Sequence, residues 1–213
     1  EFATYAITNT GTMWSCGRNY AYGQLGIKNN IDKSSLTQIL GNTWKDVKSG
    51  LIFAAARRTD NSLWLWGYNY YGQLGDGGDG YIKNSPVQEI THSTWTDYAM
   101  LNSAVVAIKS GNIYTWGINT AGSLGQGAVG DFTNSPAQIL LNDGLFTHVA
   151  GANDTMLGRK SDGTLWGAGD KSSYELDSGS NTPSNTDSII QVASSKSWAS
   201  IYALQNTVIA KQS

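Results

Sequence analysis

The chain is poor in the residues from which most catalytic and metal sites are built. Its 213 residues include one cysteine, Cys16, and two histidines, His92 and His148. One cysteine excludes an internal disulfide and any metal site that needs several cysteines. Neither histidine has a partner at metal-ligand spacing, and neither belongs to a local Ser-His-Asp or Cys-His pattern. We therefore predict a protein that is not an enzyme and that holds no metal and no cofactor.

Charge and long apolar runs are scarce as well. Asp, Glu, Lys and Arg make up 14% of the residues, the formal net charge is -2, and the pI is about 5.6. The sequence offers no general basic field to neutralise phosphates, which argues against a nucleic-acid partner. No apolar run approaches the roughly eighteen residues of a membrane-spanning helix, so we predict no membrane insertion.

No stretch of the sequence keeps a sustained helical period. The chain instead contains 25 glycines, 8 tryptophans and 11 tyrosines, together with many serines, threonines and asparagines. Aromatic residues favour strands, and glycine, asparagine and serine favour turns. This composition predicts an all-β protein with many turns.

One phrase recurs about every fifty residues. Leu63 to Gly75 reads Leu-Trp-Leu-Trp-Gly-Tyr-Asn-Tyr-Tyr-Gly-Gln-Leu-Gly, and related phrases occupy residues 113–125 and 13–26. The glycines that end the second strand of each unit stand at 17, 67, 117 and 169, at intervals of 50, 50 and 52 residues. A period of this size, with about four short strands in each unit, predicts the blades of a β-propeller.

We expect four to five blades of about fifty residues, forming a partial or small ring within a single domain or domain segment. A series of large apolar residues, Trp44, Trp95, Phe146 and Ile189, marks the unit boundaries. The fourth unit is degenerate, because Tyr174 to Asp177 replace its Gly-Gln-Leu-Gly corner. A last hairpin is expected around Gln205-Asn206. The predicted units are residues 1–43, 44–94, 95–145, 146–188 and a partial copy, 189–213.

The repeated residues have a structural interpretation. Blades bury their apolar faces against one another, and large aromatic rings supply much of the buried area. Glycines in the corners permit backbone conformations that a Cβ would forbid. The predicted structural residues of the repeat are Trp64, Trp66, Gly67, Gly72, Leu74, Gly75, Trp116, Gly117, Gly122, Leu124, Gly125 and Trp166.

Tyrosines gather in the turns that follow the glycine-ended strands, so some of them should lie together on one face. Tyrosine supplies rigid, amphipathic contact area at little entropic cost, which favours recognition of a protein or a sugar. The alternative is that about half of these rings only cover blade edges. The candidate interaction residues are Tyr20, Tyr22, Tyr68, Tyr70, Tyr71 and Tyr81.

Three other motifs give only weak support for a dinucleotide, calcium or glycosylation site. Residues 125–130 match Gly-x-Gly-x-x-Gly, but the sequence that follows cannot start the helix that a dinucleotide site needs. Asp76 and Asp79 lie in a glycine-rich loop without the glutamate of a calcium loop. Asn153 begins a lone glycosylation sequon, a match that is common by chance.

The repeated phrase, followed by Asn84-Ser85-Pro86-Val87-Gln88 and by a Trp-x-x-Val pattern, resembles the repeat of the regulator of chromosome condensation family. Members of that family typically close seven blades into a ring. Four glycine-ended units and a trailing hairpin therefore predict a fragment, a ring with fewer blades, or an open arc that another chain completes.

The charge-poor form of the repeat is more similar to the repeats of secreted bacterial and phage proteins than to those of eukaryotic nuclear proteins. This resemblance implies a non-enzymatic recognition or assembly module on a virion surface, such as a phage tail or capsid, or outside the cell. Its partners would be a protein or a glycan and other subunits of an assembly. One alternative is nucleotide exchange on a small GTPase, as in the founding family member, and another is inhibition of a secreted enzyme.

Overall fold

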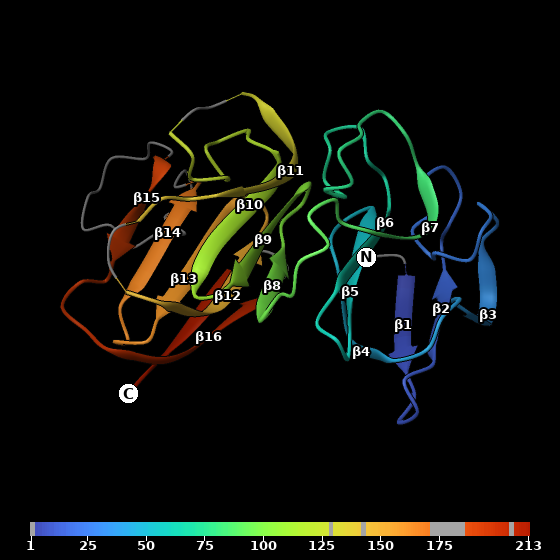
Figure 1. The fold of residues 1–213 in the computed structure, drawn as a ribbon, viewed down its shortest axis with the longest axis horizontal. Helices are drawn as coiled ribbons and strands as arrows, with labels where there is room; N and C mark the ends of the chain where they lie inside the picture. The colour runs from blue at the N-terminus through green and yellow to red at the C-terminus, as the bar shows by residue number, and fades with distance from the viewer. Residues whose placement is uncertain (1–2, 128–129, 142–143, 171–185, 205–206) are drawn as a thin grey trace.

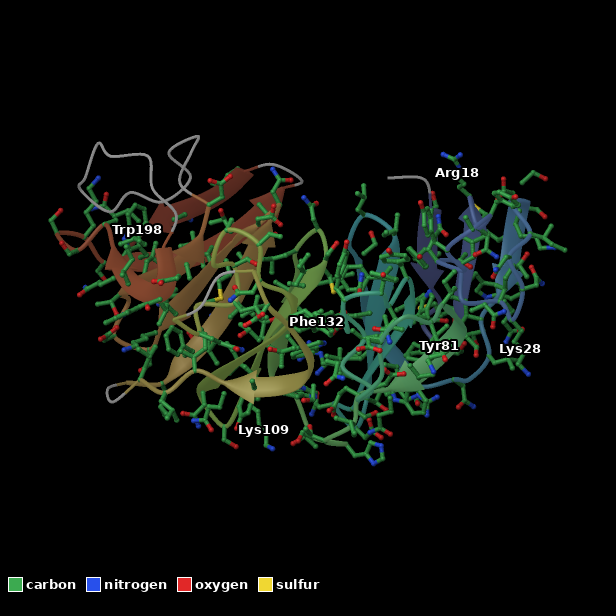
Figure 2. The ribbon with its side chains drawn as sticks, turned by 90° about the horizontal axis from the view of Figure 1, so that it is seen from above. Arg18, Lys28, Tyr81, Lys109, Phe132 and Trp198 are labelled. Carbon is green, nitrogen blue, oxygen red and sulfur yellow. The ribbon has the colours of Figure 1, made fainter. Side chains whose placement is uncertain are left out.

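The computed structural model describes residues 3–127, 130–141, 144–170, 186–204 and 207–213, and these ranges contain strands and turns but no helix. The strands form five antiparallel sheets, which follow one another in chain order. Figure 1 shows the first two sheets at the right and the later ones at the left, and Figure 2, seen from above, shows the sheets arranged along an arc. The all-β fold class predicted from the sequence is confirmed.

The second, third and fourth sheets each contain four strands. The first sheet contains β1 (Ala3–Ile7), β2 (Met13–Gly17) and β3 (Lys33–Gln38). The second contains β4 (Trp44–Ser49), β5 (Phe53–Arg58), β6 (Leu63–Gly67) and β7 (Lys83–Gln88). The third contains β8 (Asp97–Met100), β9 (Ala104–Lys109), β10 (Asn112–Ile118) and β11 (Phe132–Gln138).

The fourth sheet contains β12 (Phe146–Ala152), β13 (Thr155–Lys160), β14 (Leu165–Gly169) and β15 (Thr186–Val192). The fifth contains β16 (Trp198–Leu204) and β17 (Thr207–Gln212). Residues from β4, β8, β12 and β16 line a common cavity, so these are the inner strands of the arc.

One boundary inferred from the sequence is wrong. Ile189 belongs to β15, the outer strand of the fourth sheet, where its side chain is buried between the third and fourth sheets. The residue equivalent to Trp44 is Trp198, because Trp198 pairs with Gln212 as Trp44 pairs with Arg58. The predicted boundary at residue 188 therefore falls inside a strand. Tyr174 to Asp177 and the expected turn at Gln205-Asn206 lie outside the described residues.

The strand-ending glycines have a clear backbone role. Gly17, Gly67, Gly117 and Gly169 all have φ between +101° and +117°, a region that side chains disfavour. At each of them the pairing with the outer strand shifts register, as in a β-bulge. The bulge ends the strand and starts the long loop that leads to the outer strand.

Successive sheets share apolar cores. One core joins the first and second sheets and includes Met13, Leu25, Trp44 and Trp66, all buried. Equivalent cores join each later pair of neighbouring sheets. Because every interior sheet is covered on both faces, these four buried cores hold the arc together.

Tryptophan docking against a glycine is the repeated contact at two of these interfaces. Trp66 lies against Gly26 of the first sheet and donates its Nε1–H to the Gln24 carbonyl at 2.6 Å. Trp116 repeats this against Gly75, with the Gln73 carbonyl at 3.1 Å. At the next interface Ala168 stands in the tryptophan position, and Met156 fills the space against Gly125. Trp64 and Trp166 pack at the rims of such interfaces and are half-buried.

Candidate interaction surface

In each of the first three sheets, an asparagine side chain fixes the long loop that leads to the outer strand. The Asn69 side chain accepts the Leu74 amide hydrogen at 2.9 Å and donates to Asp76 at 3.1 Å. Asn19 and Asn119 make the same contact with the amides of Leu25 and Leu124. The repeat described in the sequence analysis includes this asparagine, but no role was assigned to it. Its fixed distance from the strand-ending glycine is the signal that could have predicted the contact.

Neighbouring loops are joined to each other by main-chain hydrogen bonds. The Lys28 amide donates to the Asn84 carbonyl at 2.7 Å, across the first and second sheets. The Gly77 amide donates to the Asn134 carbonyl at 2.9 Å, and the Asn134 side chain donates back to Gly77. These hydrogen bonds join the described parts of the loops of the first three sheets into one face, which lies at the upper edge of Figure 1.

Four of the six predicted tyrosines form a contiguous cluster on this face, which we call the tyrosine cluster. It consists of Tyr22 from the first loop and Tyr68, Tyr70 and Tyr71 from the second. Tyr22 meets Tyr68 edge to face, with 5.6 Å between ring centroids. Tyr70 stacks near Tyr68 at 6.2 Å and meets Tyr71 edge to face at 5.3 Å. The cluster thus spans the junction between two sheets.

The rings of the cluster differ in exposure. Tyr70 is 59% exposed and Tyr22 36% exposed, while Tyr68 and Tyr71 are half-buried beneath them. Burial, and then the neighbouring Tyr71, Tyr70 and Tyr22 hydroxyls, raise the pKa of Tyr68. The half-buried rings contact the exposed ones and restrict them, which lowers the entropy lost when a partner binds.

The structure does not bring the other two predicted tyrosines into the cluster. Tyr20 is 72% exposed and Tyr81 is 73% exposed, and neither makes a ring contact with the cluster. Figure 2 shows Tyr81 on the side of the arc that also carries Lys28. Both rings flank the cluster in sequence, but the structure leaves them as separate exposed side chains.

Two aspartates of these loops, Asp32 and Asp76, make structural contacts. Asp76 accepts hydrogen bonds from Asn69 and from the Gly78 amide, and it forms an ion pair with Lys83 at 3.3 Å. Asp32 accepts the amide hydrogens of Asn19 and Tyr20, which lower its pKa. Among the described residues, no group of three or more His, Cys, Asp or Glu side chains is placed to hold a metal ion.

The other sequence motifs also receive structural roles. Gly125 and Gly127 of the Gly-x-Gly-x-x-Gly match lead into β11, where a dinucleotide site would need a helix. Asn153 sits in the turn between β12 and β13, and Thr155 of its sequon is buried. The described part of the chain contains no helix long and apolar enough to cross a membrane.

A cavity of about 520 Å³ lies at the centre of the arc. Its wall includes Lys48, Asn102, Asn153 and Tyr202, which come from the inner-strand ends of four sheets. Lys48 forms an ion pair with Asp97 at 3.5 Å and donates to the Tyr98 carbonyl. Among these four residues, the sequence analysis considered only Asn153, as part of the sequon.

The sequence analysis also missed a basic residue that recurs at the same position in three sheets and lies over an aromatic ring in each. The Arg58 guanidinium lies 4.0 Å from the Trp64 ring and 4.8 Å from the Trp44 ring. Lys109 and Lys160 end the equivalent strands, and Lys160 lies 4.0 Å from the Trp166 ring. Such contacts stabilise a pair by about 0.5–1 kcal/mol at exposed sites and by about 2 kcal/mol when desolvated, as for buried Lys160. The signal was a basic residue about every fifty residues.

These features define an arc of a β-propeller. The sheets follow one another around a centre, their inner strands line a central cavity, and their loops are joined on one face. The fold is that of regulator of chromosome condensation type propellers, as the sequence predicted. The scan against family models found no match. The mouse X-linked retinitis pigmentosa GTPase regulator is 34% identical over 76 residues, which cover 34% of this chain and 8% of that protein.

Solved structures show the same fold at low identity. Human WBSCR16 matches with a TM-score of 0.84 and 17% identity, over 100% of this chain and 56% of that one. Yeast Prp20p, studied for its binding to Gsp1p and histones, matches with a TM-score of 0.85 and 16% identity, over 100% and 55%. Yeast Prp20 bound to Kap60 matches with a TM-score of 0.82 and 16% identity, over 100% and 53%. The chain therefore spans about half the length of these structures.

Proposed function

We propose that this propeller arc is a non-enzymatic binding module whose loop face holds a protein partner through the tyrosine cluster. The observation that carries the proposal is the cluster itself, in which half-buried Tyr68 and Tyr71 support exposed Tyr22 and Tyr70. Pre-ordered aromatic rings are typical anchors of protein interfaces. Yeast Prp20, which has the same fold, binds proteins, and this likeness supports a protein partner.

The partner surface should be largely uncharged. Three charged groups of these loops are already engaged, since Asp76 pairs with Lys83 and Asp32 accepts two amide hydrogens. Affinity would then come from burying the exposed faces of Tyr70 and Tyr22, with the hydroxyls as hydrogen-bonding groups. A sugar could use the same rings, and the experiment below distinguishes a glycan from a protein partner.

We place the module outside the cell or on a virion, where other subunits of an assembly would be its neighbours. The low charge and the abundance of neutral polar residues support this placement. Immunogold labelling of the source cells and of any virus particles they release tests it. Label confined to the cell interior would contradict the placement without affecting the proposed binding face.

The binding face is tested by a photo-reactive amino acid placed at position 70 or at position 202. Tyr202 is a matched control, because it is also 59% exposed but belongs to β16 at the centre of the arc. Crosslinking in the source organism should capture a protein from position 70 and not from position 202. Capture from position 202 alone would contradict the proposal, and binding on a glycan array that Tyr70→Ser abolishes would identify a sugar instead.

A second candidate is nucleotide exchange on a small GTPase, favoured by the TM-score of 0.85 with Prp20p, which binds Gsp1p. It is tested by adding the chain to Gsp1p loaded with a fluorescent guanine nucleotide. Faster nucleotide release would support exchange, and an unchanged rate would remove this candidate. Inhibition of a secreted enzyme would use the same loop face, and a crosslinked enzyme that loses activity in the complex would reveal it.

A further inference from the structure

Two buried tryptophans at equivalent places differ in whether their indole N–H has an acceptor. Trp44 starts β4, and Trp95 lies just before β8, the corresponding strand of the third sheet. The Trp95 Nε1–H is donated to a carboxylate oxygen of Glu89 at 3.2 Å. Trp44 Nε1 is buried and has no hydrogen-bond partner among the described residues. Because buried polar groups are almost always hydrogen-bonded, the unpaired Trp44 donor marks a place where an acceptor would bind favourably.

At the boundary between the second and third sheets, the chain itself supplies a carboxylate. Glu89 accepts the amide hydrogens of Thr91 and Ser93, each at 2.7 Å, in addition to the Trp95 indole N–H. A cation is linked to this carboxylate through two hydroxyl groups. Lys109 Nζ donates to Ser93 Oγ at 2.8 Å, and Thr91 Oγ1 lies 2.9 Å from Ser93 Oγ and 2.6 Å from Glu89 Oε2. This boundary therefore holds a carboxylate beside an indole N–H and a cation.

At the boundary between the first and second sheets, an apolar residue replaces the glutamate. Ile39 stands in the place of Glu89, because each directly follows the outer strand of its sheet. Arg58 ends β5 as Lys109 ends β9. The Arg58 Nε atom is buried without a partner, and the guanidinium makes ring contacts but no hydrogen bond or ion pair with the described residues.

The unpaired indole and the guanidinium face the same space. A Cβ built on Gly41 would lie 3.1 Å from Arg58 Nη2 and 3.4 Å from Trp44 Nε1. Gly41 is exposed, whereas the Arg58 side chain is half-buried against the Trp44 and Trp64 rings. Burial lowers the pKa of Arg58, and the charge of Asp60 opposes this shift. A carboxylate entering beside Gly41 would meet both groups after a small movement of the Arg58 side chain, and it would offset the cost of burying that charge.

The boundary between the fourth and fifth sheets lacks one of these groups. Trp198 Nε1 is also buried without a partner among the described residues. However, Gln212 pairs with Trp198 where Arg58 pairs with Trp44, and the Lys196 ammonium lies 5.8 Å from the Trp198 ring. Within the described part of the chain, the boundary between the first and second sheets is therefore the one that combines an unpaired indole N–H with an unpaired guanidinium.

We infer that Trp44 and Arg58 form a carboxylate-binding site between the first and second sheets. The carboxylate would come from a free organic acid or from an acidic side chain of a protein partner. Arg58 would bind it through a charge-assisted hydrogen bond, and the Trp44 N–H would fix its orientation. The site lies at the start of β4 and the end of β5, whereas the tyrosine cluster follows the end of β6, at the opposite end of the second sheet. The site is therefore independent of the proposed binding face.

The probe is sodium acetate, and the readout is the nitrogen–proton signal of each indole in an NMR spectrum of the 213-residue protein. Acetate should shift the Trp44 signal in a saturable way, while sodium chloride at the same ionic strength and neutral acetamide should not. The Trp95 signal should stay in place, because Glu89 already accepts that indole hydrogen. The Trp44 signal is assigned with Trp44→Phe, a change that the fourth sheet tolerates at the equivalent Phe146.

Two variants test the role of the cation. Arg58→Gln should weaken acetate binding about tenfold or more, because it removes the charge-assisted hydrogen bond. Arg58→Lys keeps the positive charge but not the guanidinium donors, so it should weaken binding less than Arg58→Gln does. An unmoved Trp95 signal shows that each variant remains folded.

Two blocked tripeptides, Gly-Glu-Gly and Gly-Gln-Gly, distinguish the sources of the carboxylate. Saturation by the glutamate peptide but not by acetate would identify an acidic side chain of a partner, and saturation by acetate at an equal or lower concentration would identify a free acid. Three results would overturn the inference. They are a Trp44 signal that neither acetate nor the glutamate peptide shifts, equal shifts with acetamide or the glutamine peptide, and an unchanged affinity for the carboxylate in Arg58→Gln.

Discussion

The docking of tryptophan on glycine between blades can be tested with two glycines of one loop. Gly75 has φ +65°, and a Cβ built on it would lie 2.7 Å from Trp116 Nε1. Gly80 has φ +71°, and a Cβ there would have nothing within 4 Å. Each Gly→Ala change imposes the left-handed backbone cost of about 1–2 kcal/mol. Only Gly75→Ala also forces a methyl group into the Trp116 ring.

Trp116 is fully buried and cannot move aside easily. Gly75→Ala should therefore lower the free energy of unfolding by about 1–3 kcal/mol more than Gly80→Ala does, which is the usual cost of overpacking a core. Urea unfolding followed by tryptophan fluorescence and circular dichroism gives both values. Equal costs for the two variants would refute the docking argument.

A double-mutant cycle separates this contact from backbone strain. Trp116→Phe removes the Nε1 edge that the new methyl group would meet, although it also loses the hydrogen bond to the Gln73 carbonyl. In that background the cost of Gly75→Ala should fall toward the cost of Gly80→Ala. Additive effects of the two substitutions would show that they do not share a contact.

Further predictions concern the buried carboxylate of Glu89 and the loss of folding stability at high and at low pH. Glu89 is fully buried, and its carboxylate accepts the amide hydrogens of two turn residues and the indole N–H of Trp95, so Glu89→Gln should cost about 1–3 kcal/mol in urea unfolding. Burial raises the pKa of Tyr5, so stability should fall as the pH rises above about 10, the unfolded-state value, and Tyr5→Phe should reduce that fall. Hydrogen bonds from Ser62 lower the pKa of Asp60, so its stabilisation should be lost as the pH falls below about 3.9, and Asp60→Asn should flatten this acid limb of the stability curve. A stability unchanged by Glu89→Gln, or pH curves that the other two substitutions leave unaltered, would contradict these assignments.

Much of the fold could be predicted because the repeat is a local signal. Alternating Leu63, Trp64, Leu65 and Trp66 before Gly67 define a strand and its end without reference to any distant residue. The packing of tryptophans between blades could also be predicted, because a four-stranded sheet with two apolar faces must bury both faces against its neighbours. The structure then adds which atoms meet.

The assignment of Ile189 failed because the sequence offers two apolar candidates and does not show pairing. Ile189 and Trp198 both follow the degenerate fourth unit, and only the pairing of Trp198 with Gln212 decides between them. The expected interval of about fifty residues from Phe146 would have favoured Trp198.

The tyrosine cluster could be predicted only in part. Adjacent positions in one turn place Tyr68, Tyr70 and Tyr71 close together, but nothing local shows that Tyr22 joins them from another sheet. Tyr22 meets Tyr68 across the same pair of sheets that the hydrogen bond from the Lys28 amide to the Asn84 carbonyl joins. Tyr20 is as close to Tyr22 in sequence as Tyr70 is to Tyr68, yet it makes no ring contact with the cluster.

The most direct test of the binding face is the dissociation constant of the partner captured at position 70. It is measured for the unaltered chain, for Tyr70→Ser and for Tyr202→Ser, whose tyrosines are equally exposed. Loss of a central aromatic anchor costs about 2 kcal/mol or more, so Tyr70→Ser should weaken binding about thirtyfold, while Tyr202→Ser leaves it unchanged. Equal affinities for the unaltered chain and Tyr70→Ser, or a loss confined to Tyr202→Ser, would show that the tyrosine cluster is not the binding face.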